Sequence, residues 1–211
     1  TTLTLGTSGD TVVVPSGVQL APGGGLTLTG ALAVDGGTVK LDGNYPVGTD
    51  NVALGNTALD SVEAGGINNV AIGDNAGTAI TTGDCNVAVG KDALTTNSTG
   101  TRNTAIGQGA LTANTTADNN TAVGKNSMVA NTEGHSNVAV GANALDANTT
   151  GDNNTAIGMD ALTANTTANQ NTAVGDEALK LNTTGDCNTA VGKGSLDTNT
   201  TGTRNVAVGG E

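Results

Sequence analysis

Residues 154–170 read NTAIGMDALTANTTANQ, and the repetition of this stretch along the chain decides the fold. Its opening, Asn-[Val/Thr]-Ala-[Val/Ile/Leu]-Gly, recurs ten times. The starts are spaced by 18 residues once and then always by 17, and they fall at Asn51, Asn69, Asn86, Asn103, Asn120, Asn137, Asn154, Asn171, Asn188 and Asn205. A motif that returns at a fixed period is typical of repeat architectures, in which each unit packs on its neighbours.

Each unit carries two apolar clusters, which we interpret as two short strands joined by two turns. Counted from the opening Asn, positions 1–4 form the first strand, because Val, Ile and Thr favour extended backbone. The Gly at position 5 fits the turn that follows. The second strand is centred on the Ala-Leu pair at positions 8 and 9, and the Asn-Thr-Thr-Gly stretch forms the second turn.

The predicted fold class is all-β. A helix is disfavoured because a Gly and a turn cluster interrupt every unit. One unit then makes one coil of a parallel β-roll or β-solenoid, and ten coils of about 17 residues stack at the strand spacing of ~4.8 Å.

Stacking places equivalent side chains above one another. We expect positions 4 and 9, such as Val123 and Leu162, to form a narrow core, and Asn at position 12 to form an amide ladder. Position 3 is Ala in all ten units and should point to the opposite face of the strand. We therefore predict that an alanine stripe packs against neighbouring chains in a homotrimer, which would also stabilise a rod with little core of its own. The stripe consists of Ala53, Ala71, Ala88, Ala105, Ala122, Ala139, Ala156, Ala173, Ala190 and Ala207.

Residues 1–50 differ from the rest of the chain. They lack the repeat and show period-two runs, such as Leu26-Thr27-Leu28-Thr29, separated by Gly clusters. This pattern predicts short strands joined by tight turns, in a β-prism-like shaft segment. The predicted domains are therefore a shaft over residues 1–50 and a solenoid over residues 51–211. Because the last unit is incomplete at Glu211, we expect the chain to be a segment of a longer polypeptide.

The composition is unusual for a globular domain. Among 211 residues there is no Phe or Trp and one Tyr, while Gly reaches 33, so a wide core is hard to build. The net charge of −12, with only seven Lys and Arg, argues against nucleic acid and anionic membrane surfaces as partners. No apolar run approaches the ~18 residues of a spanning helix, so we expect no membrane insertion.

The residue pattern does not indicate catalysis. There is no nucleophile–base pair and no phosphate-binding loop, and the few Glu lack the partners that glycosidase chemistry needs. We therefore expect a non-enzymatic protein without a metal or cofactor. His135, the single histidine, is interpreted as a solvated turn residue. Asp residues near the turns, such as Asp118 and Asp152, serve turn geometry, because the Gly-Gly-x-Gly-x-Asp signature of calcium-binding β-rolls is absent.

Two cysteines, Cys85 and Cys187, lie six units apart in the related stretches GDCNVAVGK and GDCNTAVGK. At a separation of roughly 29 Å, an intrachain disulfide is excluded, which leaves free thiols or an interchain disulfide near a three-fold axis.

Asn-x-Ser/Thr sequons follow from the repeat, and we interpret them as a turn ladder and not as glycan sites. Those at position 12 of the unit begin at Asn97, Asn114, Asn148, Asn165, Asn182 and Asn199.

The repeats resemble those of two families of fibrous protein. The stretch Asn68-Asn69-Val70-Ala71-Ile72-Gly73-Asp74-Asn75-Ala76 resembles the NSVAIGxxS repeat in the heads of YadA-like trimeric autotransporter adhesins. The longer unit, NTAVGxxALxxNTTGxN, is similar to repeats of phage tail-fibre and other virion-fibre proteins. The likeness covers about 160 residues from Asn51 onward, and it implies a trimeric left-handed parallel β-roll.

The departures from the adhesins favour the viral family. The unit is longer than in adhesin heads, and no coiled-coil stalk or membrane anchor is visible. We therefore expect a phage tail or virion fibre module, a structural homotrimer used for host-surface attachment or spacing. Its location would be the virion, and its partners would be other virion proteins and a host-cell surface receptor or glycan.

The alternative is the head of a bacterial trimeric adhesin at the cell surface. An ice-binding solenoid would need a flat array of spaced Thr, whereas the Thr pairs here are adjacent.

Overall fold

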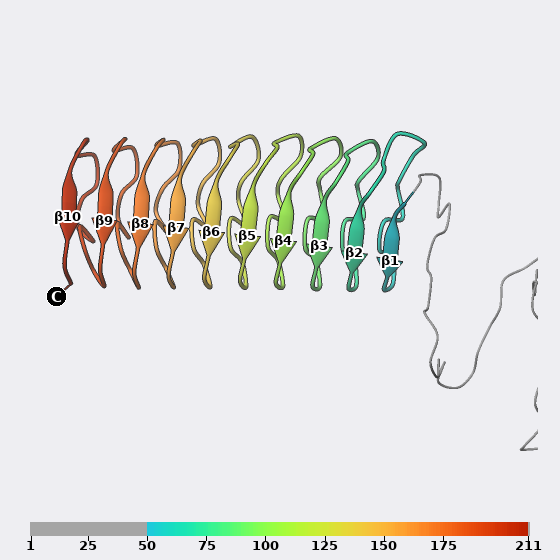
Figure 1. The fold of residues 1–211 in the computed structure, drawn as a ribbon, viewed down its shortest axis with the longest axis horizontal. Helices are drawn as coiled ribbons and strands as arrows, with labels where there is room; N and C mark the ends of the chain where they lie inside the picture. The colour runs from blue at the N-terminus through green and yellow to red at the C-terminus, as the bar shows by residue number, and fades with distance from the viewer. Residues whose placement is uncertain (1–49, 211) are drawn as a thin grey trace, which may run out of the picture. The chain divides into compact units, whose positions relative to one another are not determined.

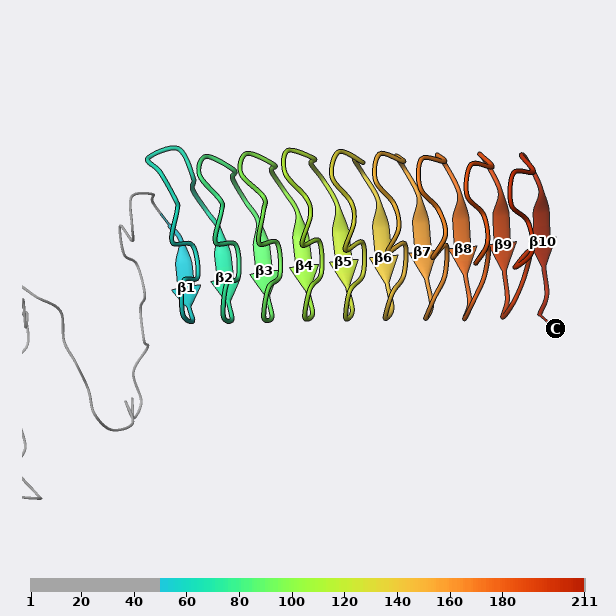
Figure 2. The ribbon, with the colours of Figure 1, turned by 180° about the vertical axis from the view of Figure 1, so that it is seen from behind.

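The computed structural model describes residues 50–210 as a stack of coils, each contributing one short parallel strand (Figures 1 and 2). The strands form one ten-stranded sheet whose order follows the sequence from β1 to β10. Their bounds are β1 Val52–Leu54, β2 Val70–Ile72, β3 Val87–Val89, β4 Thr104–Ile106, β5 Thr121–Val123, β6 Val138–Val140, β7 Thr155–Ile157, β8 Thr172–Val174, β9 Thr189–Val191 and β10 Val206–Val208. The predicted all-β solenoid of about 17 residues per coil is confirmed. The predicted shaft over residues 1–50 lies outside the described residues, apart from Asp50.

Hydrogen bonds between successive coils run around the whole circumference and not only along the sheet. In the strands, equivalent residues pair in register, as Ala105 does with Ala122. Beyond the strand, the Leu94 N–H donates to the Ala110 carbonyl, and the Ser98 N–H donates to the Thr115 carbonyl. Since buried backbone groups must be paired, this continuous pairing lets irregular backbone stack as regularly as a strand.

The predicted second strand is wrong. The Ala-Leu segment of each coil is a series of turns, because positions 7 and 9 adopt positive φ. Asp160 and Leu162 show this in one coil, with φ of 54° and 53°. A left-handed residue cannot belong to a pleated strand. Even so, Leu162 donates its N–H to the Ala178 carbonyl of the next coil, so the segment stacks along the axis as the strands do.

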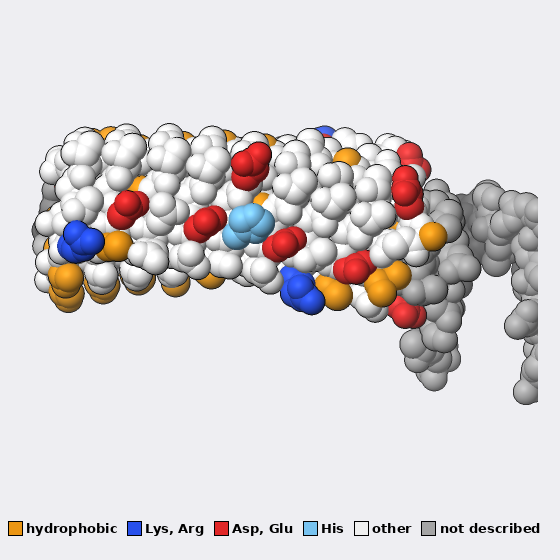
Figure 3. All heavy atoms as spheres, turned by 90° about the horizontal axis from the view of Figure 1, so that it is seen from above, with side chains coloured by type: hydrophobic (Ala, Val, Ile, Leu, Met, Phe, Trp, Pro, Cys, Tyr) orange, Lys and Arg blue, Asp and Glu red, His pale blue; other side chains and the backbone are white. Residues whose placement is uncertain are grey.

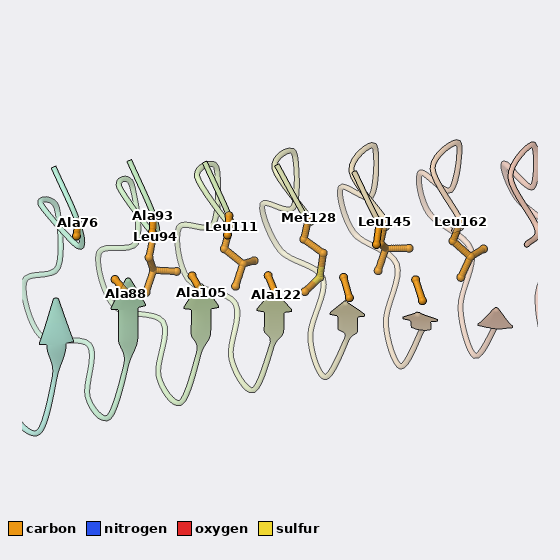
Figure 4. Close-up of a cluster of buried hydrophobic side chains, with 14 of the residues drawn as sticks. Ala76, Ala88, Ala93, Leu94, Ala105, Leu111, Ala122, Met128, Leu145 and Leu162 are labelled. Carbon is orange, nitrogen blue, oxygen red and sulfur yellow. The ribbon is translucent and has the colours of Figure 1, made fainter. Parts of the chain in front are cut away.

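Two columns of residues fill the interior, and the faces of the strand are opposite to those predicted. The position 9 side chains, such as Leu94, Leu111 and Met128, project toward the strand and meet the position 3 alanines (Figure 4). Ala105 and Ala122 are fully buried there. Alternation along the strand then sends position 4 outward, so Ile106 is 40% exposed. The interior between strand and Leu column is thin, and only a small residue fits at position 3.

The alanine stripe is therefore not a surface for neighbouring chains. Ala71, Ala88, Ala105, Ala122, Ala139, Ala156, Ala173 and Ala190 are fully buried inside their own coils, while Ala53 and Ala207, in the first and last coils, are partly exposed. The prediction failed because it placed the position 4 residues inside the coil. The interior has room for about one large side chain per coil, and the Leu at position 9 takes that place.

Asn side chains form two ladders in the interior, one at position 1 in all ten coils and one at position 12 from the third coil to the ninth. At position 12, the Asn131 amide donates to Asn114 Oδ1 at 3.1 Å and to the Gly134 carbonyl at 2.9 Å. At position 1, Asn120 donates to that same Gly134 carbonyl at 2.7 Å, and its Oδ1 accepts the Asn137 N–H. The predicted amide ladder at position 12 is confirmed, and a second ladder at position 1 joins it. In coils that have Asn at both positions, the turn is thus held by two amides.

The second coil departs from the repeat in two compensating places. Position 9 is Gly77 in place of Leu, and position 12 is Ile80 in place of Asn. Ile80 is 1% exposed, and its Cδ1 lies 3.0 Å from where a Cβ on Gly77 would stand. Ile80 therefore occupies the space that Leu fills in other coils.

The Gly at position 5 supports a prediction about stability. Gly141 has φ of +138°, and a Cβ there would lie 2.3 Å from the Gly158 carbonyl oxygen of the next coil. Gly209 has a similar φ of +132° but no atom within 4 Å of such a Cβ. Gly141→Ala should lower the free energy of unfolding by more than about 3 kcal/mol, because steric overlap adds to backbone strain. Gly209→Ala should cost only the strain, about 1–3 kcal/mol. Equal losses in chemical denaturation would contradict the close contact between coils.

The pair in the second coil supports a double-mutant cycle. Gly77→Leu alone should overpack against Ile80, and Ile80→Asn alone should leave a gap and a buried amide, each costing about 1–3 kcal/mol. Together the two changes restore the common repeat and give the Asn97 amide a second acceptor. The double variant should therefore be about as stable as the original chain, with a coupling energy above ~2 kcal/mol. Simple additivity of the two losses would refute the compensation.

Candidate functional site

The outer face of the sheet is an uncharged strip. Each strand points positions 2 and 4 outward, and none of these residues is charged in any of the ten strands. Position 2 is Val or Thr, and position 4 is Val, Ile or Leu. Several position 4 side chains are strongly exposed, including Ile72 at 38%, Ile157 at 40% and Val140 at 36%. Hydrophobic side chains follow one edge of the stack in Figure 3. Exposed apolar residues in a contiguous strip mark a surface that is used for contact.

A polar row runs along the turn that precedes each strand, at positions 16 and 17. Position 16 side chains accept a backbone N–H from the preceding coil, as Asp118 Oδ1 does from Thr101 at 2.6 Å. His135 takes part in the same way, because its Nδ1 accepts the Asp118 N–H at 2.9 Å. Figure 3 shows acidic side chains in line along this face with the histidine among them. The interpretation of His135 as an exposed turn residue is confirmed, with an added role in joining two coils.

Position 17 adopts left-handed backbone in every complete coil, with φ close to +58°. This conformation turns the side chain away from the interior. Both cysteines lie in this column and are free, Cys85 exposed and Cys187 half-buried. Cys187 Sγ donates to Gln170 Oε1 at 3.2 Å. The exclusion of an intrachain disulfide is therefore confirmed, whereas an interchain disulfide stays a prediction.

The six sequon asparagines at position 12 lie inside the coils, whereas Asn119 and Asn153, which also begin Asn-x-Thr stretches, are exposed at position 17. Asn97, Asn114, Asn148, Asn165 and Asn182 are fully buried, and the Asn199 side chain joins the same ladder by donating to Asn182 Oδ1. A glycosyltransferase needs an accessible amide nitrogen, and these nitrogens are engaged in hydrogen bonds, such as Asn148 Nδ2 to Asn131 Oδ1 at 2.8 Å. The interpretation of the position 12 sequons as a turn ladder is confirmed.

Acidic residues are spread singly along the stack. Within residues 50–210 there is no group of three or more His, Cys, Asp or Glu side chains placed to hold a metal ion. The turn aspartates instead accept backbone N–H groups, as Asp84 Oδ1 does from Ile67 at 2.9 Å. Their geometry suits turn stabilisation.

The turn after the strand carries ion pairs between neighbouring coils at two places, around Lys91 and between Lys193 and Asp176. Lys91 Nζ lies 2.8 Å from Asp92 Oδ2 and 3.4 Å from Asp74 Oδ2. The hydrogen bond with Asp92 raises the pKa of Lys91 and lowers the pKa of Asp92. Both groups are well exposed, so the pair adds little to stability. It does mark a charged border next to the uncharged strip.

Asp146 is the acidic side chain in the least favourable place. Its Oδ1 is buried and has no hydrogen-bond partner. Burial raises the pKa of Asp146, and the negative charge of Asp160 raises it further. Because the folded chain holds this proton more tightly than the unfolded chain, stability is lost as the pH rises through the pKa of the folded state.

This pKa shift predicts the effect of a single change. Asp146→Asn should raise the melting temperature at pH 7, because a neutral amide is buried at less cost than a carboxylate. The difference should shrink as the pH falls below about 4, the ordinary pKa of Asp, because the carboxyl then becomes protonated in folded and unfolded chains alike. Asp60→Asn, at the same coil position with an exposed side chain, is the matched control and should change little at either pH. A lower melting temperature for Asp146→Asn at pH 7 would contradict the buried carboxylate.

The described part of the chain holds no helix able to cross a membrane. No family model, curated protein or solved structure matches the chain. The functional argument therefore depends on the surfaces of the solenoid itself.

Proposed function

We propose that the chain is a non-enzymatic structural module of a phage tail or virion fibre, an elongated homotrimer that attaches to a host surface or spaces an attachment tip. The observation that carries the proposal is the uncharged outer face of the sheet. A chain with a net charge of −12 keeps every charge off this strip over ten successive strands. Such a strip suits burial against copies of itself, and not exposure to water.

The interior of the solenoid gives the reason for association. From the third coil onward, each complete coil has one large apolar side chain in the interior, the Leu or Met at position 9, and the rest of the interior is mostly Ala and Asn. So thin a core contributes little hydrophobic stabilisation per residue. Packing three sheets face to face would bury the Val and Ile of position 4 in a second, central core. The proposed trimer interface therefore consists of the outward residues of the strands, and not of the alanine stripe on the same strands.

The stacking pattern suits a mechanical role. Every coil repeats the same hydrogen bonds to its neighbours, so the solenoid extends without a change in cross-section. The ten strands span about 43 Å at the strand spacing. A rigid spacer of this kind fits a fibre that holds a receptor-binding region away from a particle, with other virion proteins as neighbours.

The bacterial alternative uses the same surface. The stretch from Asn68 to Ala76, which carries the adhesin-like motif, forms β2 and the turn after it. A trimeric adhesin head on a cell surface would bury the same strip. A coiled-coil stalk and a membrane anchor elsewhere in the full-length protein would favour this second function.

Sedimentation of the purified chain tests the proposal. The mass should be three times the chain mass of 20.3 kDa. Val140→Lys combined with Ile157→Lys places two charges on the strip and should yield folded monomers with an unchanged circular dichroism spectrum, because both side chains point outward. Thr150→Lys, at an exposed position away from the sheet, should leave the trimer intact. A monomeric original chain, or a trimer that survives the double change, would overturn this interface.

A further inference from the structure

An open groove of about 600 Å³ crosses the polar row of positions 16 and 17. It extends over the last four complete coils, from Asp152 and Asn153 to Thr203 and Arg204. Three coil steps separate its ends, a length of about 14 Å. Its volume lies within the range of small-molecule sites, but its lining is polar, whereas such sites are mostly apolar. The groove therefore suits an elongated, hydrophilic ligand.

The floor of the groove offers hydrogen-bonding groups at a regular spacing. At position 16, one oxygen each of Asp152, Asn169 and Asp186 accepts a backbone N–H from the preceding coil. These bonds fix the three side chains. The second carboxylate oxygen of each Asp and the amide nitrogen of Asn169 have no hydrogen-bond partner within residues 50–210. Acceptor, donor and acceptor thus follow one another along the groove.

Position 17 forms the wall of the groove. Asn153, Gln170 and Arg204 are exposed, and the half-buried Cys187 lies between the last two, with its Sγ donating to Gln170 Oε1. Their left-handed backbone turns the side chains outward. Asn and Gln amides and the Arg guanidinium supply donors opposite the acceptors of position 16. Since the protein fixes this backbone before any ligand binds, ordering it costs no further entropy.

We infer that this groove binds an extended oligosaccharide of uncharged sugars, with about one ring for each coil. Alternating donors and acceptors match the hydroxyl groups of sugars, which both donate and accept. The two carboxylates against one guanidinium give the groove a net negative charge, which disfavours acidic sugars. This assignment deepens the proposed attachment function, because a surface glycan would be what the fibre recognises.

The spacing of the groups argues against a peptide in the groove. An extended peptide advances ~3.4 Å per residue, whereas the coils repeat at ~4.8 Å. A peptide laid along the groove would fall out of step with the side chains within two coils. A pyranose ring in an extended glycan is close to one coil step in length, so successive rings stay in step with positions 16 and 17 of successive coils.

Calorimetric titration of the whole chain with linear tetrasaccharides tests the inference. The neutral probes are cellotetraose, maltotetraose and chitotetraose, and an oligogalacturonate is the acidic comparator. At least one neutral probe should bind with a Kd of about 1 mM or tighter, and more tightly than the acidic one. Gln170→Ala combined with Arg204→Ala should weaken that binding about fivefold or more.

Arg102→Ala is the matched control. Arg102 and its neighbour Thr101 repeat Thr203 and Arg204 six coils earlier, but Arg102 does not line the groove. Its removal should leave the affinity unchanged. The inference is overturned if none of the neutral probes binds, if only the acidic one binds, or if the groove variant binds as the original chain does.

Measuring the sedimentation mass of the same sample separates this inference from the proposed trimer. A monomer that binds a neutral tetrasaccharide would refute the trimer and keep the groove. A trimer that binds none would refute the groove and keep the trimer.

Discussion

The structure depends on one constraint, which is that every coil must hydrogen-bond to the coil on each side of it around its full circumference. Strand, turns and Asn ladders all satisfy this condition at one spacing. Equivalent residues are consequently forced into columns, and each column can hold only side chains that tolerate a copy of themselves one strand spacing away. Leu, Ala, Asn and Gly meet that condition in the interior, each in its own place.

The period of the sequence was enough to predict the coil, the parallel stacking and the amide ladder at position 12. It was not enough to predict which way the strand faces. The alternation of side chains along a strand requires only that Ala156 and Ile157 point to opposite faces. Hydrophobicity alone favours placing the larger of the two inside the coil. The deciding factor is the volume left between the strand and the Leu162 column, which is a property of the closed coil and is not visible in a strand by itself. An invariant small residue in a repeat was the available signal for that limit.

The left-handed backbone at the position 9 Leu residues could not be predicted from conformational propensity. The Asn, Asp and Gly that are common at position 7 do favour positive φ, but Leu does not. Leu162 adopts it because its N–H must reach Ala178 in the next coil while its side chain enters the core. Tertiary pairing overrides local preference here. The same effect produced the polar groove, because position 17 is turned outward by its backbone and not by its chemistry. Sequence patterns alone therefore located the turns but not the surface they create.

The coils from the third onward share both Asn ladders, so they are nearly interchangeable, whereas the second coil relies on its own pair, Gly77 and Ile80. A genetic exchange that inserts or removes a whole unit within the uniform part would rejoin every column without a mismatch. The length of such a solenoid can thus change in steps of one strand spacing during evolution, while its cross-section and its uncharged strip stay the same. The increment in length is therefore set by the spacing of the hydrogen bonds between coils.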